Sequence, residues 1–191
     1  MGIRIGLIGA GSIANVHAAA INEAGSTLVA VCDLDIAKAE ELLQAHAGSE
    51  SAGVALDTAE AVLAMDEVDA VVVATPNASH VPLACQALEA GKSVLLEKPM
   101  GVSTQECRQA CQVQQTTGQC LQMGFVTRQS DVVLHAVEAL ASGGIGEVYH
   151  VDVALHRRRG IPGLGGWFTT KAQSGGGVLV DIGPHLIDLA L

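Results

Sequence analysis

A glycine-rich segment near the start of the chain has a spacing that suits phosphate binding. Gly9, Gly11 and Ala14 fit the pattern G-x-G-x-x-A, between a short apolar stretch and an alanine-rich one. The two glycines allow a tight turn that a pyrophosphate can approach closely, and the small third residue lets a helix pack on its strand. That helix would present unpaired N–H groups, near Ser12 and Ile13, to the phosphates. The segment therefore predicts a dinucleotide site.

A carboxylate stands where the ribose of such a dinucleotide would need one. Asp33 ends a second apolar stretch, and its distance beyond Ala14 is close to the ~20 residues expected of the acid that bonds the ribose hydroxyls. A carboxylate here repels the 2′-phosphate of NADP, so we expect NAD. Lys38, nearby, leaves NADP open as an alternative. Asp33 could instead cap the following helix, a role that Asp35 could fill equally well.

Polar segments also stop the later apolar stretches. The tripeptides Thr-Pro-Asn at 75–77 and Glu-Lys-Pro at 97–99 each follow such a stretch, and Gly124 follows another. Ligands of parallel sheets bind at the carboxyl ends of the strands, so we expect these segments to surround the cofactor. The residue before a proline favours an extended backbone, which points Lys98 off the end of its strand. Whether the Lys98–Pro99 bond is cis stays open.

Three polar residues near the end of the chain share a helical spacing. Asp181, His185 and Asp188 stand at i, i+4 and i+7, on one face of a helix expected at 177–191. Such a row is most often a solvated face, but the preceding glycines would let a ligand or a strand come close. Histidine suits proton transfer near neutral pH, because its reference pKa is about 6.5. A base of this kind, with Lys98 to stabilise a negatively charged oxygen, fits the oxidation of an alcohol.

Stretches with strand and helix patterns alternate over the first two thirds of the chain, which predicts right-handed crossovers and a parallel α/β sheet. Capping residues start several helices, Asn77 among them. The expected strands are 3–8, 27–32, 54–56, 69–74, 93–96 and 120–125, and the expected helices are 13–20, 36–45, one that begins near 58, 77–88 and 104–116.

The pattern changes after residue 125. A helix is expected at 130–141, and 148–155 reads as a strand that would begin a second sheet. A loop rich in glycine and proline at 160–166 leads to Trp167, Phe168 and Lys171. This loop could be a lid or a substrate contact, or equally an ordinary connection with an anchoring aromatic.

Composition narrows the class of protein. The net charge of −10 argues against nucleic-acid binding, and the arginines at 157–159 read as a solvated strand end. Five cysteines without a Cys-x-x-Cys pair predict reduced thiols, no metal site and a cytoplasmic location. We find no signal peptide and no membrane-spanning apolar run.

Together these segments resemble the Gfo/Idh/MocA family, which includes glucose–fructose oxidoreductase and inositol dehydrogenase. The resemblance covers essentially the whole chain and implies a Rossmann domain at 1–125. It also implies that 126–191 begin a C-terminal domain with an open, mostly antiparallel sheet, incomplete here, through which the protein would form a homo-oligomer. The implied reaction is hydride exchange between NAD and a sugar-like or polyol alcohol. The matching segments are the glycine turn, Ala74-Thr75-Pro76-Asn77 with His80, Glu97-Lys98-Pro99, and Ser174-Gly175-Gly176-Gly177 followed by Asp181, Gly183, His185 and Asp188.

The resemblance also assigns roles to single residues. It implies a catalytic group of Lys98, Asp181 and His185. Because histidine suits proton transfer near neutral pH, we expect His185 to be the base, and His156 would be the next candidate. The substrate is expected to contact Arg128, Trp167 and Lys171. The cofactor is expected to contact Gly9, Gly11, Ser12, Ile13, Asp33, Thr75, Pro76, Asn77, His80, Glu97 and Lys98.

Two departures from the family pattern stand out. Gly124-Phe125-Val126 replaces the frequent Gly-Phe-Asn, which removes one polar group near the site. The final helix is still apolar and periodic at Leu191, so we expect the chain to be part of a longer one. Two other functions would use the same fold, namely a regulatory protein that binds NAD(P) without turnover and a glycosidase that uses NAD. The intact Lys98, Asp181 and His185 argue against the regulator.

Overall fold

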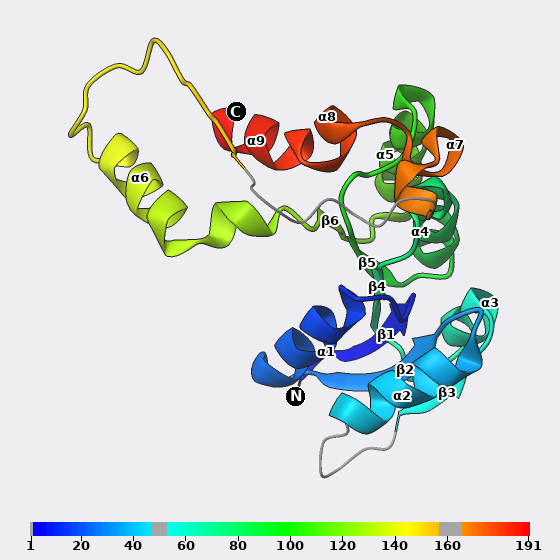
Figure 1. Cartoon of the computed structure of the whole chain (residues 1–191). Helices are drawn as coiled ribbons and strands as arrows, with labels where there is room; N and C mark the ends of the chain where they lie inside the picture. Colours follow the sequence, from blue (N-terminus) through cyan, green and yellow to red (C-terminus); the bar gives the residue numbers. More distant parts are fainter. Residues whose placement is uncertain (1, 47–52, 157–165) are drawn as a thin grey trace.

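A computed structural model describes residues 2–46, 53–156 and 166–191 of the chain. Its centre is a six-stranded sheet of strand order β3-β2-β1-β4-β5-β6 in which every neighbouring pair is parallel (Figure 1). This is the order of a Rossmann fold, so the predicted α/β class is confirmed. The strands are β1 (Arg4–Ile8), β2 (Thr27–Cys32), β3 (Val54–Leu56), β4 (Ala70–Val73), β5 (Ser93–Leu96) and β6 (Leu121–Met123).

Helices cover the sheet because its strands are apolar on both faces. In β4, Val72 packs toward the α1 and α2 side, whereas Val71 and Val73 pack toward the α3 and α4 side. The predicted helices of this half are all present, with ends that shift by a few residues. They are α1 (Ala14–Glu23), α2 (Ile36–His46), α3 (Ala59–Leu63), η1 (Asn77–Ser79) with α4 (His80–Glu89), and α5 (Thr104–Thr117).

Local signals explain where these helices begin and end. The side chain of Thr58 accepts a hydrogen bond from the N–H of Ala61, and that of Ser103 accepts one from the N–H of Glu106. Gly118 ends α5 in a left-handed conformation, at φ 69°. The prediction that Asn77 caps a helix is wrong, because Asn77 lies inside η1 and its amide donates elsewhere.

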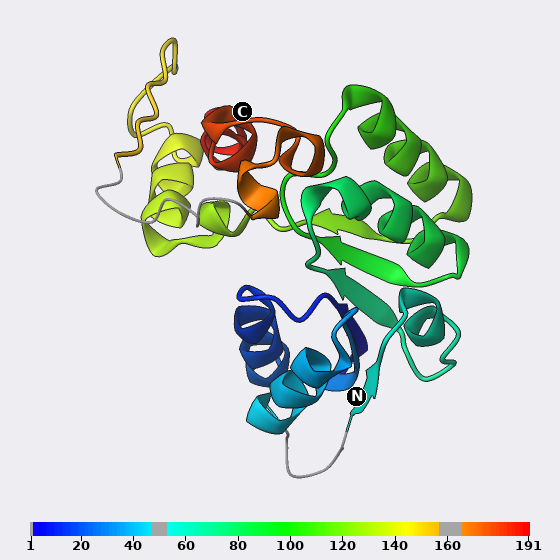
Figure 2. The same ribbon diagram turned by 45° about the vertical axis from the view of Figure 1, so that its right-hand side comes forward.

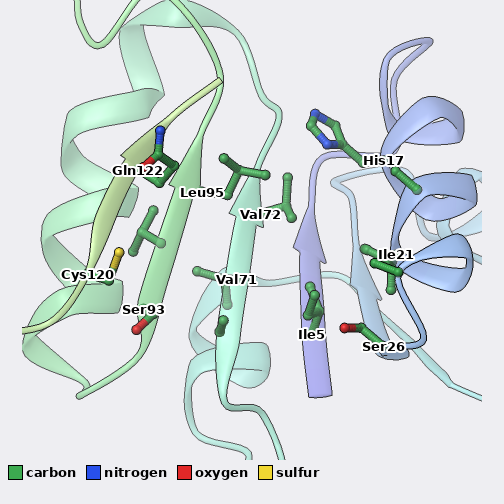
Figure 3. A pocket seen from close by; sticks show the side chains of 14 residues that line it. Ile5, His17, Ile21, Ser26, Val71, Val72, Ser93, Leu95, Cys120 and Gln122 are labelled. Carbon is green, nitrogen blue, oxygen red and sulfur yellow. The ribbon is translucent and has the colours of Figure 1, made fainter. Parts of the chain in front are cut away.

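One face of the sheet is partly open. Beyond α1, the strands β4, β5 and β6 line a hollow of about 320 Å³, whose walls include Ile5, Val72 and Leu95 (Figure 3). His17 reaches into its rim from α1. The opposite face carries α4 and α5, which pack side by side (Figure 2).

The last third of the chain lies next to the carboxyl ends of the strands and contacts them through α7 and α8 (Figures 1 and 2). Its elements are η2 (Val126–Gln129), α6 (Asp131–Ala141), η3 (Trp167–Thr169), α7 (Lys171–Ser174), α8 (Val178–Asp181) and α9 (Gly183–Ala190).

Two predictions for this part are wrong. The stretch 148–155 forms no strand with the described residues, since it pairs with neither edge strand of the sheet, β3 or β6, and most of it is exposed. The helix expected at 177–191 is two helices that break at Ile182. Pro184 causes the break, since its ring lacks an N–H and fits only the first turn of a helix. The arginines at 157–159 and the loop at 160–165 lie outside the described residues.

Candidate functional site

A hollow of about 990 Å³ lies at the carboxyl ends of the strands. Every residue that the sequence assigned to the cofactor lines it. Ligands of Rossmann folds bind in this crevice, so the position is the one that the topology predicts. The lining residues of that set are Gly9, Gly11, Ser12, Ile13, Asp33, Thr75, Pro76, Asn77, His80, Glu97 and Lys98.

The glycine turn is shaped for a close approach. Gly9 has a φ of +100°, and a Cβ there would stand 2.6 Å from the carbonyl oxygen of Ala74. No described atom lies within 4 Å of a Cβ built on Gly11, so this side of the turn is open. Ala14 is fully buried under the turn. The turn thus offers backbone N–H groups and room for a phosphate.

Asp33 holds this turn in place. Its Oδ2 accepts the N–H of Ala10 at 2.8 Å, and its Oδ1 accepts the N–H of Asp35 at 3.0 Å. The carboxylate therefore ties β2 to the glycine turn while it lines the hollow. Lys38, the residue that left NADP open, also lines the hollow. Its Nζ lies 3.7 Å from Oδ2 of Asp35.

The acidic character of this end is wider than the sequence indicated. Asp57, directly after β3, and Glu60, in the first turn of α3, also line the hollow. Burial, together with the charges of Asp33, Asp57 and Glu60, raises the pKa of Cys32 to about 11. We did not predict these two acids, although strand order places the residue after β3 beside the residue after β2. Their charge disfavours a further phosphate at this end.

The side chains of His80 and Asn77 form hydrogen bonds with backbone carbonyl oxygens of the chain. His80 is 1% exposed, with Nδ1 2.7 Å from the carbonyl oxygen of Pro99 and Nε2 2.8 Å from that of Thr75. Asn77 donates from its amide to the carbonyl oxygen of Ser174 at 2.8 Å. Both residues line the hollow, and their side chains fix the loops around it. The Lys98–Pro99 bond, which the sequence left open, is cis.

The three residues of the expected catalytic group come from two distant parts of the chain. The ammonium of Lys98 donates to the carboxylate Oδ1 and to the carbonyl oxygen of Asp181, both at 2.9 Å. The Nδ1 of His185 is buried and has no partner among the described residues. Burial lowers the pKa of His185, as does the charge of Lys98, whereas Glu97, Asp181 and Asp188 oppose the shift. The imidazole is therefore neutral at neutral pH.

Asp188, the third member of the expected polar row, faces a different partner. Its carboxylate accepts hydrogen bonds from Nε of Arg128, at 2.8 Å, and from a terminal nitrogen of the same guanidinium. The guanidinium of Arg128 also lies 5.8 Å from the ring of Phe125. Arg128, expected to contact substrate, is thus engaged in joining η2 to α9.

Of the other expected substrate contacts, Trp167 lines the hollow and Lys171 does not. Trp167 and Phe168 both line the hollow and lie against each other, with ring centroids 4.4 Å apart. Lys171 is exposed at the start of α7 and is not among the lining residues. His156, the alternative base, is exposed as well.

The described residues contain neither a candidate membrane span nor a candidate metal cluster. No helix there has the length and apolarity to cross a membrane. Within the same ranges, no three His, Cys, Asp or Glu side chains gather as metal ligands would. All five cysteines are free.

Comparison with protein families assigns both parts of the chain. Residues 3–125 match the model of an oxidoreductase family with an NAD-binding Rossmann fold. Residues 133–191 match the model of the GFO/IDH/MocA C-terminal domain.

Several curated proteins are similar to the chain. D-glucoside 3-dehydrogenase of Escherichia coli (strain K12) is 34% identical over 191 residues, which are 99% of this chain and 53% of that protein. Inositol 2-dehydrogenase of Rhizobium meliloti (strain 1021) is 32% identical, over 100% of this chain and 54% of that protein. The chain thus spans about half the length of the curated relatives it matches.

Solved structures of similar proteins superpose on this chain. GenD2 from gentamicin A biosynthesis, crystallised with NAD, superposes with a TM-score of 0.82 at 29% identity, over 98% of this chain and 52% of that one. A putative myo-inositol dehydrogenase from Sinorhizobium meliloti 1021 has a TM-score of 0.81 at 31% identity, over 98% and 54% of the two chains.

Proposed function

This chain belongs to the Gfo/Idh/MocA family of oxidoreductases with an NAD-binding Rossmann fold, and on this premise we propose that it serves an NAD-dependent dehydrogenase. The reaction would move a hydride between the nicotinamide and a secondary alcohol of a sugar, a polyol or a related hydroxylated molecule. The observation that carries the proposal is the meeting of Lys98 with Asp181 at the hollow that the cofactor set lines. The dehydrogenase names of the relatives agree with it.

The residues present fit NAD. The open side of Gly11 and the start of α1 suit the pyrophosphate, and the carboxylate of Asp33 suits the ribose hydroxyls. When bound, the nicotinamide supplies the acceptor or the donor of the hydride.

Lys98 would hold the reacting oxygen. An ammonium has three N–H donors, and two hydrogen bonds from Lys98 go to Asp181, so one donor is left for a substrate hydroxyl. This donor stabilises the oxygen as its proton leaves. Asp181 fixes the direction of the ammonium and offsets its charge.

His185 would take the proton. A neutral imidazole is the form that accepts a proton, and the lowered pKa keeps His185 in that form. Its buried Nδ1 lacks a partner in the described part of the chain, which costs about 1–3 kcal/mol. We assign the proton transfer to this side chain.

The surroundings of the protein are part of the proposal. Five free cysteines are typical of a reducing compartment, which supports a cytoplasmic location. The second sheet implied by the family would join subunits into a homo-oligomer. Sedimentation of the full-length protein would measure this directly, and a monomer at all concentrations would contradict it.

A screen of the full-length protein over polyols and aldoses, with NAD or NADP, tests the activity. We expect NADH to form with at least one of these alcohols. Binding of NAD without turnover of any alcohol would favour the regulatory alternative, and release of nitrophenol from nitrophenyl glycosides would favour the glycosidase.

The Asp33→Ala variant should narrow the preference for NAD over NADP by about tenfold, because it removes a carboxylate from the place where a 2′-phosphate would bind. It should also weaken NADH binding, since Asp33 holds the N–H of Ala10. Energy transfer from Trp167, the single tryptophan of the chain, to bound NADH or NADPH gives both affinities.

Asp66→Ala is the matched control. It removes the same charge from an exposed side chain that lies outside the hollow. Its ratio of NADH to NADPH affinity should stay unchanged. Equal affinities for NADH and NADPH in the unaltered protein would refute the role of Asp33.

A further inference from the structure

A pair of partly buried polar side chains joins the cofactor helix α1 to the segment after β5 that carries Lys98. His17 lies on α1, and its Nε2 stands 2.8 Å from Oε1 of Glu97, the residue that follows β5. The two side chains are only 15% and 16% exposed. Sequence analysis did not single out His17, because one histidine among alanines on a helix has no motif around it.

The carboxylate of Glu97 is held from more than one direction. Its second oxygen, Oε2, accepts the backbone N–H of Lys98 at 3.1 Å. Gly124, at the end of β6, leaves room for the carboxylate, since a Cβ there would stand 3.3 Å from Oε1. A carboxylate with this little exposure needs donors, and it receives them from His17 and from the Lys98 amide.

Lys98 is consequently fixed at both of its ends. Glu97 holds its backbone N–H, and Asp181 holds its ammonium. Glu97 lines the cofactor hollow, whereas His17 lines the open hollow on the sheet face beyond α1 (Figure 3). The pair therefore forms part of the wall between the two hollows.

We propose that His17 is a positioning residue for Lys98, and that it acts by holding the carboxylate of Glu97 on the Lys98 amide. This inference rests on the proposed function for its effect on turnover. Without His17, Glu97 would keep a buried charge with one donor fewer. The carboxylate would then rotate toward water or toward the ammonium of Lys98, and either movement releases the Lys98 amide.

The charge state of Glu97 agrees with this arrangement. Burial acts to raise the pKa of Glu97, but the hydrogen bond and charge of His17, with the Lys98 amide and ammonium, lower it overall. Glu97 is therefore a carboxylate at neutral pH and accepts both hydrogen bonds.

Three variants separate positioning from simple stabilisation. His17→Leu removes the donor and keeps the bulk. His17→Gln restores an N–H donor near the position of Nε2. His46→Leu is the matched control, because His46 also contacts a side chain of α1, Asn15 at 3.1 Å, but lies away from both hollows.

The first measurement needs no substrate. Hydrogen exchange of the Lys98 amide, followed by NMR, should be about tenfold faster in His17→Leu, as expected for the loss of one hydrogen bond. The exchange rate should return to that of the unaltered protein in His17→Gln, and it should equal that of the unaltered protein in His46→Leu. Unchanged exchange in His17→Leu would overturn the proposal.

The second measurement uses the full-length enzyme with an accepted alcohol. We expect kcat to fall about tenfold in His17→Leu, while KM and NADH affinity hold, and to recover in His17→Gln, because a small misplacement of a catalytic group is costly. If His17→Leu loses stability and NADH affinity but keeps its kcat, His17 has a structural role only, and the proposal is overturned.

Two further variants keep the test decisive. Should His17→Leu fail to fold, Glu97→Leu removes the carboxylate that both contacts share and should also free the Lys98 amide. Full turnover in Lys98→Met would instead refute the proposed catalytic role of Lys98, and the exchange measurement would still decide whether His17 positions its backbone.

Discussion

The Lys98→Met variant should lose turnover by about 10²–10³ in kcat, the usual effect of one donor to a developing oxyanion. Methionine is of similar length and apolar, so it fills the space of the lysine stem without a donor. NADH affinity should hold, because the glycine turn and Asp33 lie on other strands. Steady-state kinetics of the full-length enzyme and energy transfer to NADH measure the two effects.

Lys92→Met is the control for this change. The ammonium of Lys92 donates to the carbonyl oxygen of Met65 at 2.9 Å, outside the cofactor hollow. Its turnover should equal that of the unaltered enzyme. A Lys98→Met enzyme that works as well as the Lys92→Met enzyme would show that the oxygen is stabilised by another group.

The Rossmann half of the fold could be predicted because its signals are local. Apolar runs stop at glycines, prolines and acids, and the strands that they predict pair with one another inside the chain. The bounds predicted for β2 and β3 agree with the structure for this reason. The segment 148–155 has a similar alternation, but a strand also needs a partner edge, and a pattern within one segment says nothing of that partner.

Proline explains why the structure has two helices where the sequence predicts one at 177–191. The apolar period across 177–191 continues through Pro184, so periodicity alone predicts one helix. The structure begins α9 at Gly183, and Asp181 consequently ends its own short helix. That position brings Asp181 to Lys98, a contact across 83 residues of sequence.

The site could be predicted as a set but not as a network. Strand order alone brings the glycine turn, Asp33 and Lys98 to one edge of the sheet. The partners of individual side chains depend on loops that meet only in three dimensions. Asn77, for example, donates to Ser174, 97 residues away, and no local pattern indicates that contact.

The His185→Ala variant should lose about 10²–10⁴ in turnover, the usual contribution of one general base. Its NADH affinity should survive, because His185 is not among the residues that line the cofactor hollow. His185→Asn should behave alike, since an amide cannot take up the proton. His135→Ala, on the exposed face of α6, is the matched control and should keep full turnover.

The pH dependence gives a second and independent test of the same base. Only the neutral imidazole accepts a proton, so the rate of alcohol oxidation should rise with pH through the pKa of His185 and then level off. Burial and the charge of Lys98 lower that pKa, so the midpoint should lie below the ordinary ~6.5. In Lys98→Met, the NMR titration of His185 should move upward, because a repelling charge is gone. If the His185→Ala variant keeps its turnover and the His156→Ala variant loses it, the base is His156 instead.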